Sequence, residues 1–243
     1  MSQKLFELNP SIDRRALARR FQRDGRVQVR NFLTEDTAAT IARILKSDTP
    51  WGFAYKREGS EPVRLRRDEA AQMPEPERRM IANAIHETAA VGEYAVRFNQ
   101  YPLLTAYQEK WEPGSPHDLL IEHINAEPMM SLVRELTGIA SLKKADAQAT
   151  LFGPGDFLSI HNDSHMAEGW RVAYVLNFSP PQWSPDWGGY LNFFDDDGDV
   201  VAGWRPRFNA LNLFGVPQRH HVSYVPPFAP LARTAITGWF RDR

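Results

Sequence analysis

The fold is decided by residues 157–239, which open with Phe157-Leu158-Ser159-Ile160-His161-Asn162-Asp163. If this opening stretch is a strand that runs into a turn, alternation places His161 and Asp163 on one face and Asn162 on the other. An imidazole and a carboxylate then converge. The pattern therefore predicts two of the three ligands of a metal site.

A third ligand is available much later in the chain, in Gln218-Arg219-His220-His221-Val222-Ser223-Tyr224-Val225, which a sheet can fold back over the first two. Two His and one carboxylate on one face of a metal leave other positions open, as non-haem Fe(II) oxygenases require. Arg233 adds a cation that can pair in two-pronged fashion with a carboxylate of an acidic co-substrate. These residues together indicate an oxygenase-type iron site.

The composition is that of an ordinary globular protein. The 243 residues are enough for a substantial core, and 29 basic against 30 acidic residues give a formal charge of −1. This balance argues against nucleic acid or an anionic membrane as a partner. Because the chain has no cysteine, thiolate metal sites, disulfides and a cysteine nucleophile are excluded. Any metal must be bound by nitrogen and oxygen.

No targeting or membrane segment is visible. The first ten residues have no long apolar core, and no later apolar run approaches the ~20 residues needed to span a bilayer. We therefore expect a cytoplasmic protein that does not contact membranes.

The predicted secondary structure changes from mainly helical to mainly strand after Leu142. Helical patterns dominate before this point: they follow Ser11 and Thr34 and cover about 77–96 and 127–136, with strand positions near Val27 and within 52–72. Residues 101–116 are expected to be an irregular connection that, with 52–72, covers the mouth of the site. A mouth closed by these two segments would favour a small ligand, and an open groove would favour a polypeptide.

Strand-length segments separated by turn residues follow Leu142. They cover residues 145–152, 157–161, 171–178, 189–194, 199–203, 210–214, 221–225 and 234–240. This order predicts an α+β fold in which a double-stranded β-helix, or jelly roll, is braced by N-terminal helices. We expect a single oxygenase domain over 1–243, with a helical preface over 1–140 and a jelly-roll core over 141–243 that carries the metal site.

Six stretches in the second half of the chain carry a resemblance to a known family. They are residues 147–158, 161–163, 171–176, 187–191, 220–225 and 233–240. In this order they resemble the 2-oxoglutarate/Fe(II)-dependent dioxygenases, in particular the prolyl-hydroxylase-like branch that includes the ribosomal-protein prolyl hydroxylases. The resemblance implies that His161, Asp163 and His220 are the iron ligands and that Arg233 binds the distal carboxylate of 2-oxoglutarate. It also implies O2 as co-substrate, with ascorbate as a further candidate cofactor.

Two other histidines compete for the third position. The family pattern His-x-Val-x-x-Val fits His220 as its first residue, and strand alternation then points His221 away. His165 is an alternative ligand, but its neighbours favour a loop.

The chain departs from its relatives where they bind the co-substrate. Relatives often have Tyr at the positions of Phe152 and Asn177, and Ser at the position of Ala235. Phe152 cannot donate a hydrogen bond, whereas Asn177 can. The resemblance therefore predicts a rewired pocket or a different keto acid. The replacement contacts are expected from Gln148, Thr150, Asn177 and Thr237, with ordinary strand packing as the alternative.

Substrate contacts are less defined. Arg171 and Tyr107 are candidates, and a structural ion pair is an equal alternative for Arg171. The tryptophans either line a peptide groove or pack in the core; these are Trp170, Trp183, Trp187, Trp204 and Trp239.

The resemblance implies a dioxygenase that hydroxylates an unactivated C–H bond, with a prolyl residue of a protein or peptide as the expected target. A free amino acid or another small molecule is the alternative within the same chemistry. From other classes, a metal-binding jelly-roll sensor without turnover and a hydrolytic zinc site remain open. Neither of these explains Arg233. The sequence gives neither the substrate identity nor the oligomeric state.

Overall fold

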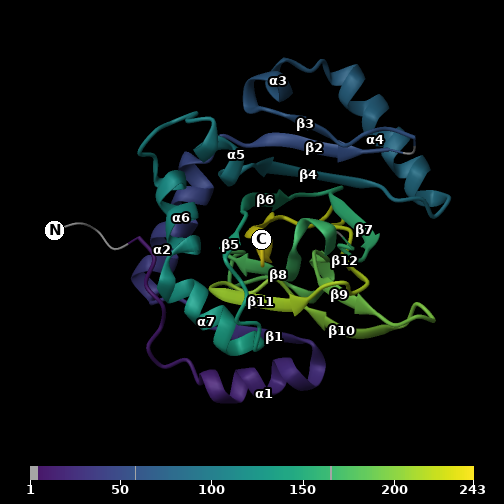
Figure 1. Ribbon diagram of the computed structural model, residues 1–243. Coiled ribbons are helices and arrows are strands. Elements are labelled where there is room, and N and C mark those ends of the chain that lie inside the picture. Colours follow the sequence, from purple (N-terminus) through teal and green to yellow (C-terminus); the bar gives the residue numbers. More distant parts are fainter. Residues whose placement is uncertain (1–4, 58, 165) are drawn as a thin grey trace.

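The computed structural model describes residues 5–57, 59–164 and 166–243, which form seven α-helices and thirteen strands (Figure 1). The helices are α1 (Arg14–Asp24), α2 (Glu35–Arg43), α3 (Arg67–Gln72), α4 (Glu75–Ala90), α5 (Leu103–Gln108), α6 (Pro116–Asn125) and α7 (Glu127–Thr137). The strands before the sequence change are β1 (Arg26–Arg30), β2 (Gly52–Lys56), β3 (Val63–Leu65) and β4 (Val96–Tyr101). Those after it are β5 (Lys144–Ala145), β6 (Gln148–Phe152), β7 (Phe157–His161), β8 (Trp170–Asn177), β9 (Leu191–Phe194), β10 (Val200–Trp204), β11 (Ala210–Gly215), β12 (His220–Val222) and β13 (Arg233–Arg241).

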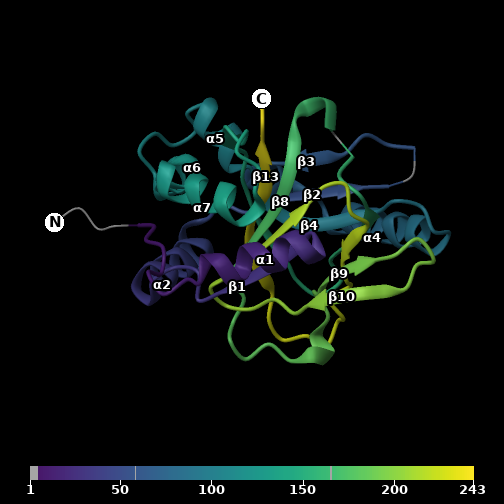
Figure 2. The ribbon, with the colours of Figure 1, turned by 60° about the horizontal axis from the view of Figure 1, so that its bottom comes forward.

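All the pairings in the sheet are antiparallel, and its strand order is β1-β11-β8-β13-β6-β4-β7-β12-β9-β10. The sheet curls so that β7, β12, β9 and β10 lie opposite β6, β13 and β8, as Figures 1 and 2 show. This is the double-stranded β-helix with bracing helices, and the predicted α+β fold is confirmed. Each strand segment predicted after Leu142 overlaps an observed strand.

The strand β4 joins the two layers of the sheet. One of its edges pairs with β6 through Asn99 and Leu151, and farther along the same edge Val96 pairs with Leu158 of β7. The hairpin β2–β3 pairs with the other edge of β4. Strands from the first 140 residues are therefore part of the same sheet as the jelly roll.

The helices α1, α2, α6 and α7 cover the outer side of the sheet (Figure 1). The α1 helix is capped by Asp13, whose Oδ1 accepts from Ala16 N, and it ends at Gly25 with φ 65°. The largest hydrophobic core lies between these helices and the sheet, with Ile41, Leu132 and Leu213 fully buried. Over the described ranges, no helix has the length and apolar character needed to cross a membrane.

The predicted helix over 77–96 is too long. The α4 helix ends at Ala90, Gly92 follows with φ 81°, and β4 begins at Val96. On this helix Ile81 and Ile85 are buried, whereas the side chain of Met80 is exposed. The segment 101–116, expected to be irregular, contains α5, which buries Leu103 and Ala106. The α5 helix is short, and its two buried residues do not produce a clear helical periodicity in the sequence.

Candidate metal centre

His161 and His220 face each other across the neighbouring strands β7 and β12. Their Cα atoms are register partners, and their ring centroids lie 4.1 Å apart. The Nδ1 atom of His161 lies 2.9 Å from Ser159 O, and that of His220 lies 2.8 Å from Gln218 O. Because a carbonyl oxygen only accepts hydrogen bonds, each Nδ1 carries the proton. Each Nε2 therefore keeps its lone pair free for a metal.

Asp163 completes the group, although not by strand alternation. The strand β7 ends at His161, and Asp163 follows in a left-handed conformation with φ 54°. This turn brings Oδ1 to 3.3 Å from His161 Nε2 and Oδ2 to 3.5 Å from His220 Nε2. The three donor groups lie within 4.8 Å of one another, so they can hold one metal ion. The predicted convergence is present, but the turn produces it.

The carboxylate is also held by Trp239. The indole Nε1 donates to Asp163 Oδ2 at 2.9 Å, and the indole ring stacks on Trp170 with centroids 3.9 Å apart. No pattern in the sequence indicated this contact, because a tryptophan in a strand is more often a core residue.

The charges of the group suit metal binding. Burial, followed by the charge of His161, lowers the pKa of His220 to about 4, so its imidazole is neutral at neutral pH. Burial acts to raise the pKa of Asp163, but its contacts with His161, His220 and Trp239 hold that pKa below its usual value. Neutral imidazoles and an ionised carboxylate are the protonation states that bind metals.

Arg233, at the start of β13, lies in the same cavity. Its side chain is 1% exposed, and its Nε and Nη1 atoms have no hydrogen-bond partner among the residues that the structure describes. Burial lowers the pKa of Arg233 to about 10, which leaves it charged at neutral pH, and its Cζ lies 5.0 Å from the centre of the Phe152 ring. A buried cation without an anion is costly, so this guanidinium suits an anionic ligand.

The cavity, hereafter the metal cavity, has a volume of about 550 Å³ and is lined by the three candidate ligands, Arg233 and both apolar and polar side chains. Residues 147–241, which contain all four of these groups, match the family model of the 2OG-Fe(II) oxygenase superfamily. Over this segment, the chain is similar to the 2OG-Fe(II) oxygenases. No curated protein matches the chain.

Solved structures share the fold of this chain at low sequence identity. A Pseudomonas putida prolyl-4-hydroxylase is 17% identical, with 98% of this chain and 95% of that chain covered and a TM-score of 0.58. A prolyl hydroxylase from Trichoplax adhaerens, in complex with a hypoxia inducible factor peptide fragment, is 15% identical over 94% and 89%, with a TM-score of 0.60. A 2OG-Fe(II) oxygenase family oxidoreductase from Burkholderia pseudomallei is 11% identical over 98% and 94%, with a TM-score of 0.60.

The structure separates the predicted co-substrate contacts into those that line the metal cavity and one that does not. Gln148, Thr150 and Thr237 line the metal cavity. Asn177 does not line it: its Nδ2 lies 3.3 Å from both Val175 O and Ala210 O, which turns the amide toward the neighbouring strand β11. The contact of Asn177 with the co-substrate stays a prediction, and its side chain does not line the metal cavity.

The two candidate substrate contacts also lie outside the metal cavity. Arg171 Nε pairs with Asp242 Oδ2 at 2.6 Å, which is the structural alternative named for it. Tyr107 lies on α5, where its hydroxyl donates to Glu122 Oε1 at 3.1 Å. Neither lines the cavity that holds the candidate ligands.

The competing histidines have different outcomes. His221 points away from the cavity, and its Nε2 lies 3.0 Å from Asn192 Nδ2. His165 lies outside the described residues.

The mouth of the metal cavity contains residues that sequence reasoning did not single out. Tyr94 packs edge-on against His161 with ring centroids 6.0 Å apart. Partial burial and then the charge of Asp163 raise the pKa of Tyr94 to about 12, so it stays a neutral hydroxyl. Lys56 Nζ lies 5.4 Å from the centre of the Tyr94 ring, and Arg64 lines the same mouth. The prediction that 52–72 covers the mouth was the only signal for Lys56 and Arg64, and no prediction pointed to Tyr94.

Proposed function

We propose that this oxygenase is an Fe(II)- and 2-oxoglutarate-dependent dioxygenase that hydroxylates a prolyl residue in a polypeptide. The observation that carries the proposal is the placement of Arg233, a buried cation without an anionic partner among the described residues, in the cavity of the His161–Asp163–His220 group. A metal sensor or a hydrolytic zinc site would have no use for such a cation.

Each residue has a defined part in this proposal. Nε2 of His161, Nε2 of His220 and a carboxylate oxygen of Asp163 would hold Fe(II), and Arg233 would bind the far carboxylate of 2-oxoglutarate. When bound, Fe(II), 2-oxoglutarate and O2 supply an oxidation that yields succinate and CO2 and hydroxylates a nearby C–H bond.

The protein itself orients these groups and keeps water out. Phe152, Leu191, Phe214 and Val222 form apolar parts of the wall around the donor atoms. In such surroundings the attraction between Arg233 and a bound carboxylate is stronger than in water. Gln148 and Thr237 provide polar groups on the same wall.

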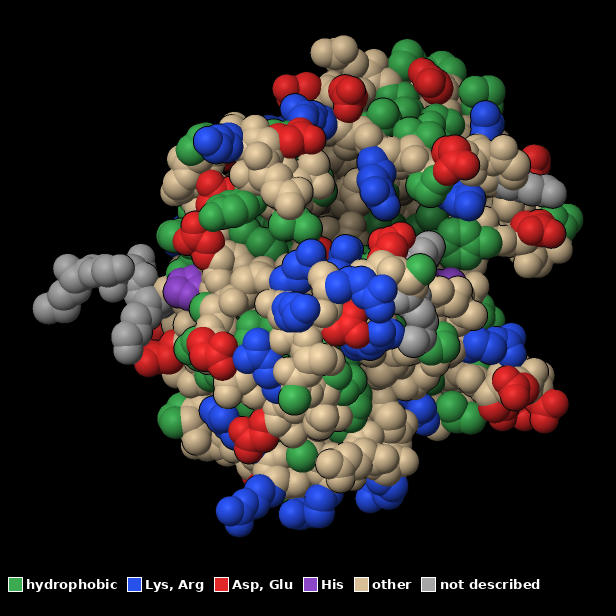
Figure 3. Space-filling view, viewed as in Figure 1, with side chains coloured by type: hydrophobic (Ala, Val, Ile, Leu, Met, Phe, Trp, Pro, Cys, Tyr) green, Lys and Arg blue, Asp and Glu red, His purple; other side chains and the backbone are tan. Residues whose placement is uncertain are grey.

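A second hollow supports a polypeptide substrate rather than a free amino acid. This hollow, hereafter the trough, has a volume of about 1080 Å³ and runs between α3, α5 and the ends of β8 and β13. It shares Arg64, Gln100, Gln148, Trp170 and Trp239 with the metal cavity. Figure 3 shows the surface hollowed there, with Lys and Arg side chains gathered along one side. An open trough of this size can hold several residues of an extended chain.

The choice of a prolyl residue rests on the resemblance and on fold-level analogy. Two of the similar structures are prolyl hydroxylases, and one of these holds a peptide fragment. A free amino acid or another small molecule is the alternative within the same chemistry. The need for ascorbate and a cytoplasmic location also remain predictions from the sequence.

The test is an intact-mass screen of proline-containing peptides and lysate proteins. We expect a one-oxygen gain that requires both Fe(II) and 2-oxoglutarate and is lost in His220→Ala. Fragmentation of the product should place the oxygen on proline. An oxygen found on another residue type would contradict the prolyl assignment, and succinate formation that persists in His220→Ala would contradict the site.

A further inference from the structure

Two cations of the β2–β3 hairpin face the mouth of the metal cavity. Arg64 is the cross-strand partner of Ala54, and Lys56 lies two residues beyond Ala54, so all three side chains are on one face of the hairpin. All three line the metal cavity. Lys56 and Arg64 are hereafter called the cationic rim.

The cationic rim has no anionic partner within the part of the chain that the structure describes. Neither Lys56 nor Arg64 forms an ion pair there, and Glu61, which lines the same cavity, pairs with neither. Two like charges that are diagonal neighbours on one hairpin face repel each other. A bound anion would relieve this repulsion.

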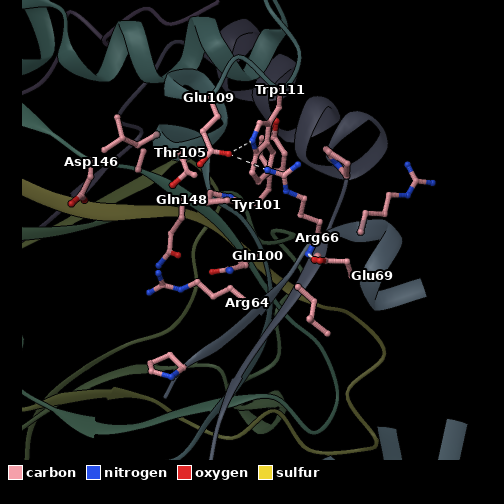
Figure 4. Close-up of a pocket in the computed structure, with 18 of the residues that line it drawn as sticks. Arg64, Arg66, Glu69, Gln100, Tyr101, Thr105, Glu109, Trp111, Asp146 and Gln148 are labelled. Carbon is pink, nitrogen blue, oxygen red and sulfur yellow. Dashed lines mark hydrogen bonds and ion pairs between the residues drawn. The ribbon is translucent and has the colours of Figure 1, made fainter. Parts of the chain in front are cut away.

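Two other cations of the trough, Arg66 and Arg241, are already paired. Arg66 Nη2 lies 3.0 Å from Glu109 Oε2, and Arg66 Cζ lies 3.7 Å from the centre of the Trp111 ring (Figure 4). Arg241 pairs with Asp146. These two groups can contact a substrate backbone, but their charges are largely compensated. Arg67 also lines the trough, but it is exposed and does not line the metal cavity. Charge selection at the mouth of the metal cavity therefore falls to the cationic rim.

Arg64 lies at the junction of the two hollows. It lines both the trough and the metal cavity, and Figure 4 shows its side chain directed across the trough toward Gln148. The stacked indoles of Trp170 and Trp239 also line both hollows. A chain that passes from the trough to the metal cavity therefore has to pass Arg64.

We infer that the cationic rim selects a polypeptide with an acidic side chain beside the residue that reacts. The carboxylate would accept two hydrogen bonds from the Arg64 guanidinium and lie near the Lys56 ammonium. The neighbouring residue would then reach past Trp239 toward the candidate ligands. This inference rests on the proposed function and adds a substrate class to it.

The test measures binding rather than turnover. Three dye-labelled synthetic peptides carry a central proline flanked by Glu, by Gln or by Lys, and their affinities are measured by fluorescence anisotropy under nitrogen, with Fe(II) and 2-oxoglutarate present. We expect the Glu peptide to bind about tenfold more tightly than the Gln peptide, as one charge-assisted contact allows, and the Lys peptide to bind most weakly.

Four variants locate the effect. Lys56→Gln/Arg64→Gln should bind the three peptides alike, Arg64→Glu should prefer the Lys peptide, and Arg64→Lys should keep part of the preference for Glu. Arg19→Gln, on the exposed face of α1 at the far side of the sheet from β3, is the matched control and should behave as the wild type (Figure 1). Unchanged thermal unfolding midpoints would show that each variant is folded.

Three results would overturn the inference: equal affinities for the three peptides, a Glu preference that survives in the double variant, or binding of none of them. The proposed function fails separately. A Glu preference without oxygen gain in air would leave the charge selection standing and reject prolyl hydroxylation of these peptides. Oxygen gain without a charge preference would do the reverse.

Discussion

Trp239 Nε1 lies 2.9 Å from Asp163 Oδ2, and the Trp239 indole stacks on the indole of Trp170. The hydrogen bond fixes one oxygen of the only carboxylate in the candidate ligand group. Outer hydrogen bonds of this kind orient a ligand and tune its affinity for a metal. Trp239 is therefore a positioning residue for Asp163.

Replacing this indole should weaken iron binding without unfolding the protein. In Trp239→Phe the ring still stacks on Trp170, but the donor to Asp163 is lost. We expect a loss of about 10- to 100-fold in Fe(II) affinity, measured by anaerobic competition with a chelator. Trp204→Phe, in β10, is the control and should not change that affinity. Equal affinities in the two variants would show that the indole contact does not position the carboxylate.

The neighbouring histidines of β12 should behave in opposite ways. His220→Ala removes a candidate ligand, so Fe(II) affinity should fall by more than the about 100-fold reached when an outer partner is lost, and succinate formation should stop. His221→Ala removes a side chain that contacts Asn192 on the other face and should keep both properties. Metal content and succinate release measure the two effects. If His220→Ala retained iron, the assignment of His220 as a ligand would be wrong.

Arg233→Met should separate stability from co-substrate binding. The wild-type guanidinium is buried, and its Nε and Nη1 atoms are unpaired in the described part of the chain, so its removal should not lower the unfolding midpoint without ligand. With Fe(II) present, 2-oxoglutarate at 100 times its Kd should stabilise the wild type by about 2.7 kcal/mol and the variant hardly at all. Arg171→Met, outside the cavity, should respond to 2-oxoglutarate as the wild type does. A full response in Arg233→Met would refute the assignment.

Asp156 should give a pH dependence of stability of unusual sign. Its side chain is buried, and burial raises its pKa to about 6 despite Gly153 N–H and Arg97, whose Nε lies 3.0 Å from Oδ1. Between about pH 4 and 6 the folded state then holds a proton that the unfolded state has lost, so this group lowers stability as pH rises through that window.

Asp156→Asn should remove this contribution while its amide oxygen still accepts from Gly153. Relative to the wild type, its unfolding free energy should increase by on the order of 2–3 kcal/mol from pH 4 to pH 7. Urea unfolding at several pH values measures the difference. Parallel curves for the two proteins would show that the Asp156 carboxyl does not titrate in this window.

The sequence predicted the strands of this fold from β-forming segments of strand length and the turn residues between them. Among the strands after Leu142, β9 alternates, whereas β8 and β11 are buried along most of their length. These strands are bounded by turn residues and were found nearly where expected. The side chains of His161 and His220 meet because β7 and β12 are neighbours, which the resemblance implied. Local patterns and family order were enough for these features.

Other features depend on contacts between distant residues that leave no local pattern. The left-handed turn at Asp163 and its hydrogen bond from Trp239 are visible only in three dimensions. Tyr107 and Arg171 were chosen for their chemistry, but α5 and the ion pair with Asp242 place them elsewhere. The cationic rim was missed because a charged hairpin in isolation is more often a solvated surface.

The strand β4 has a consequence for protein engineering. It closes the seam between β6 and β7, the strand that carries the first candidate ligand, yet it comes from the half of the chain outside the family match. A fragment cut to residues 141–243 would carry all the candidate ligands but leave two strand edges open to other chains, which promotes aggregation. Transplanting this candidate metal site into another scaffold would require a substitute for that one N-terminal strand.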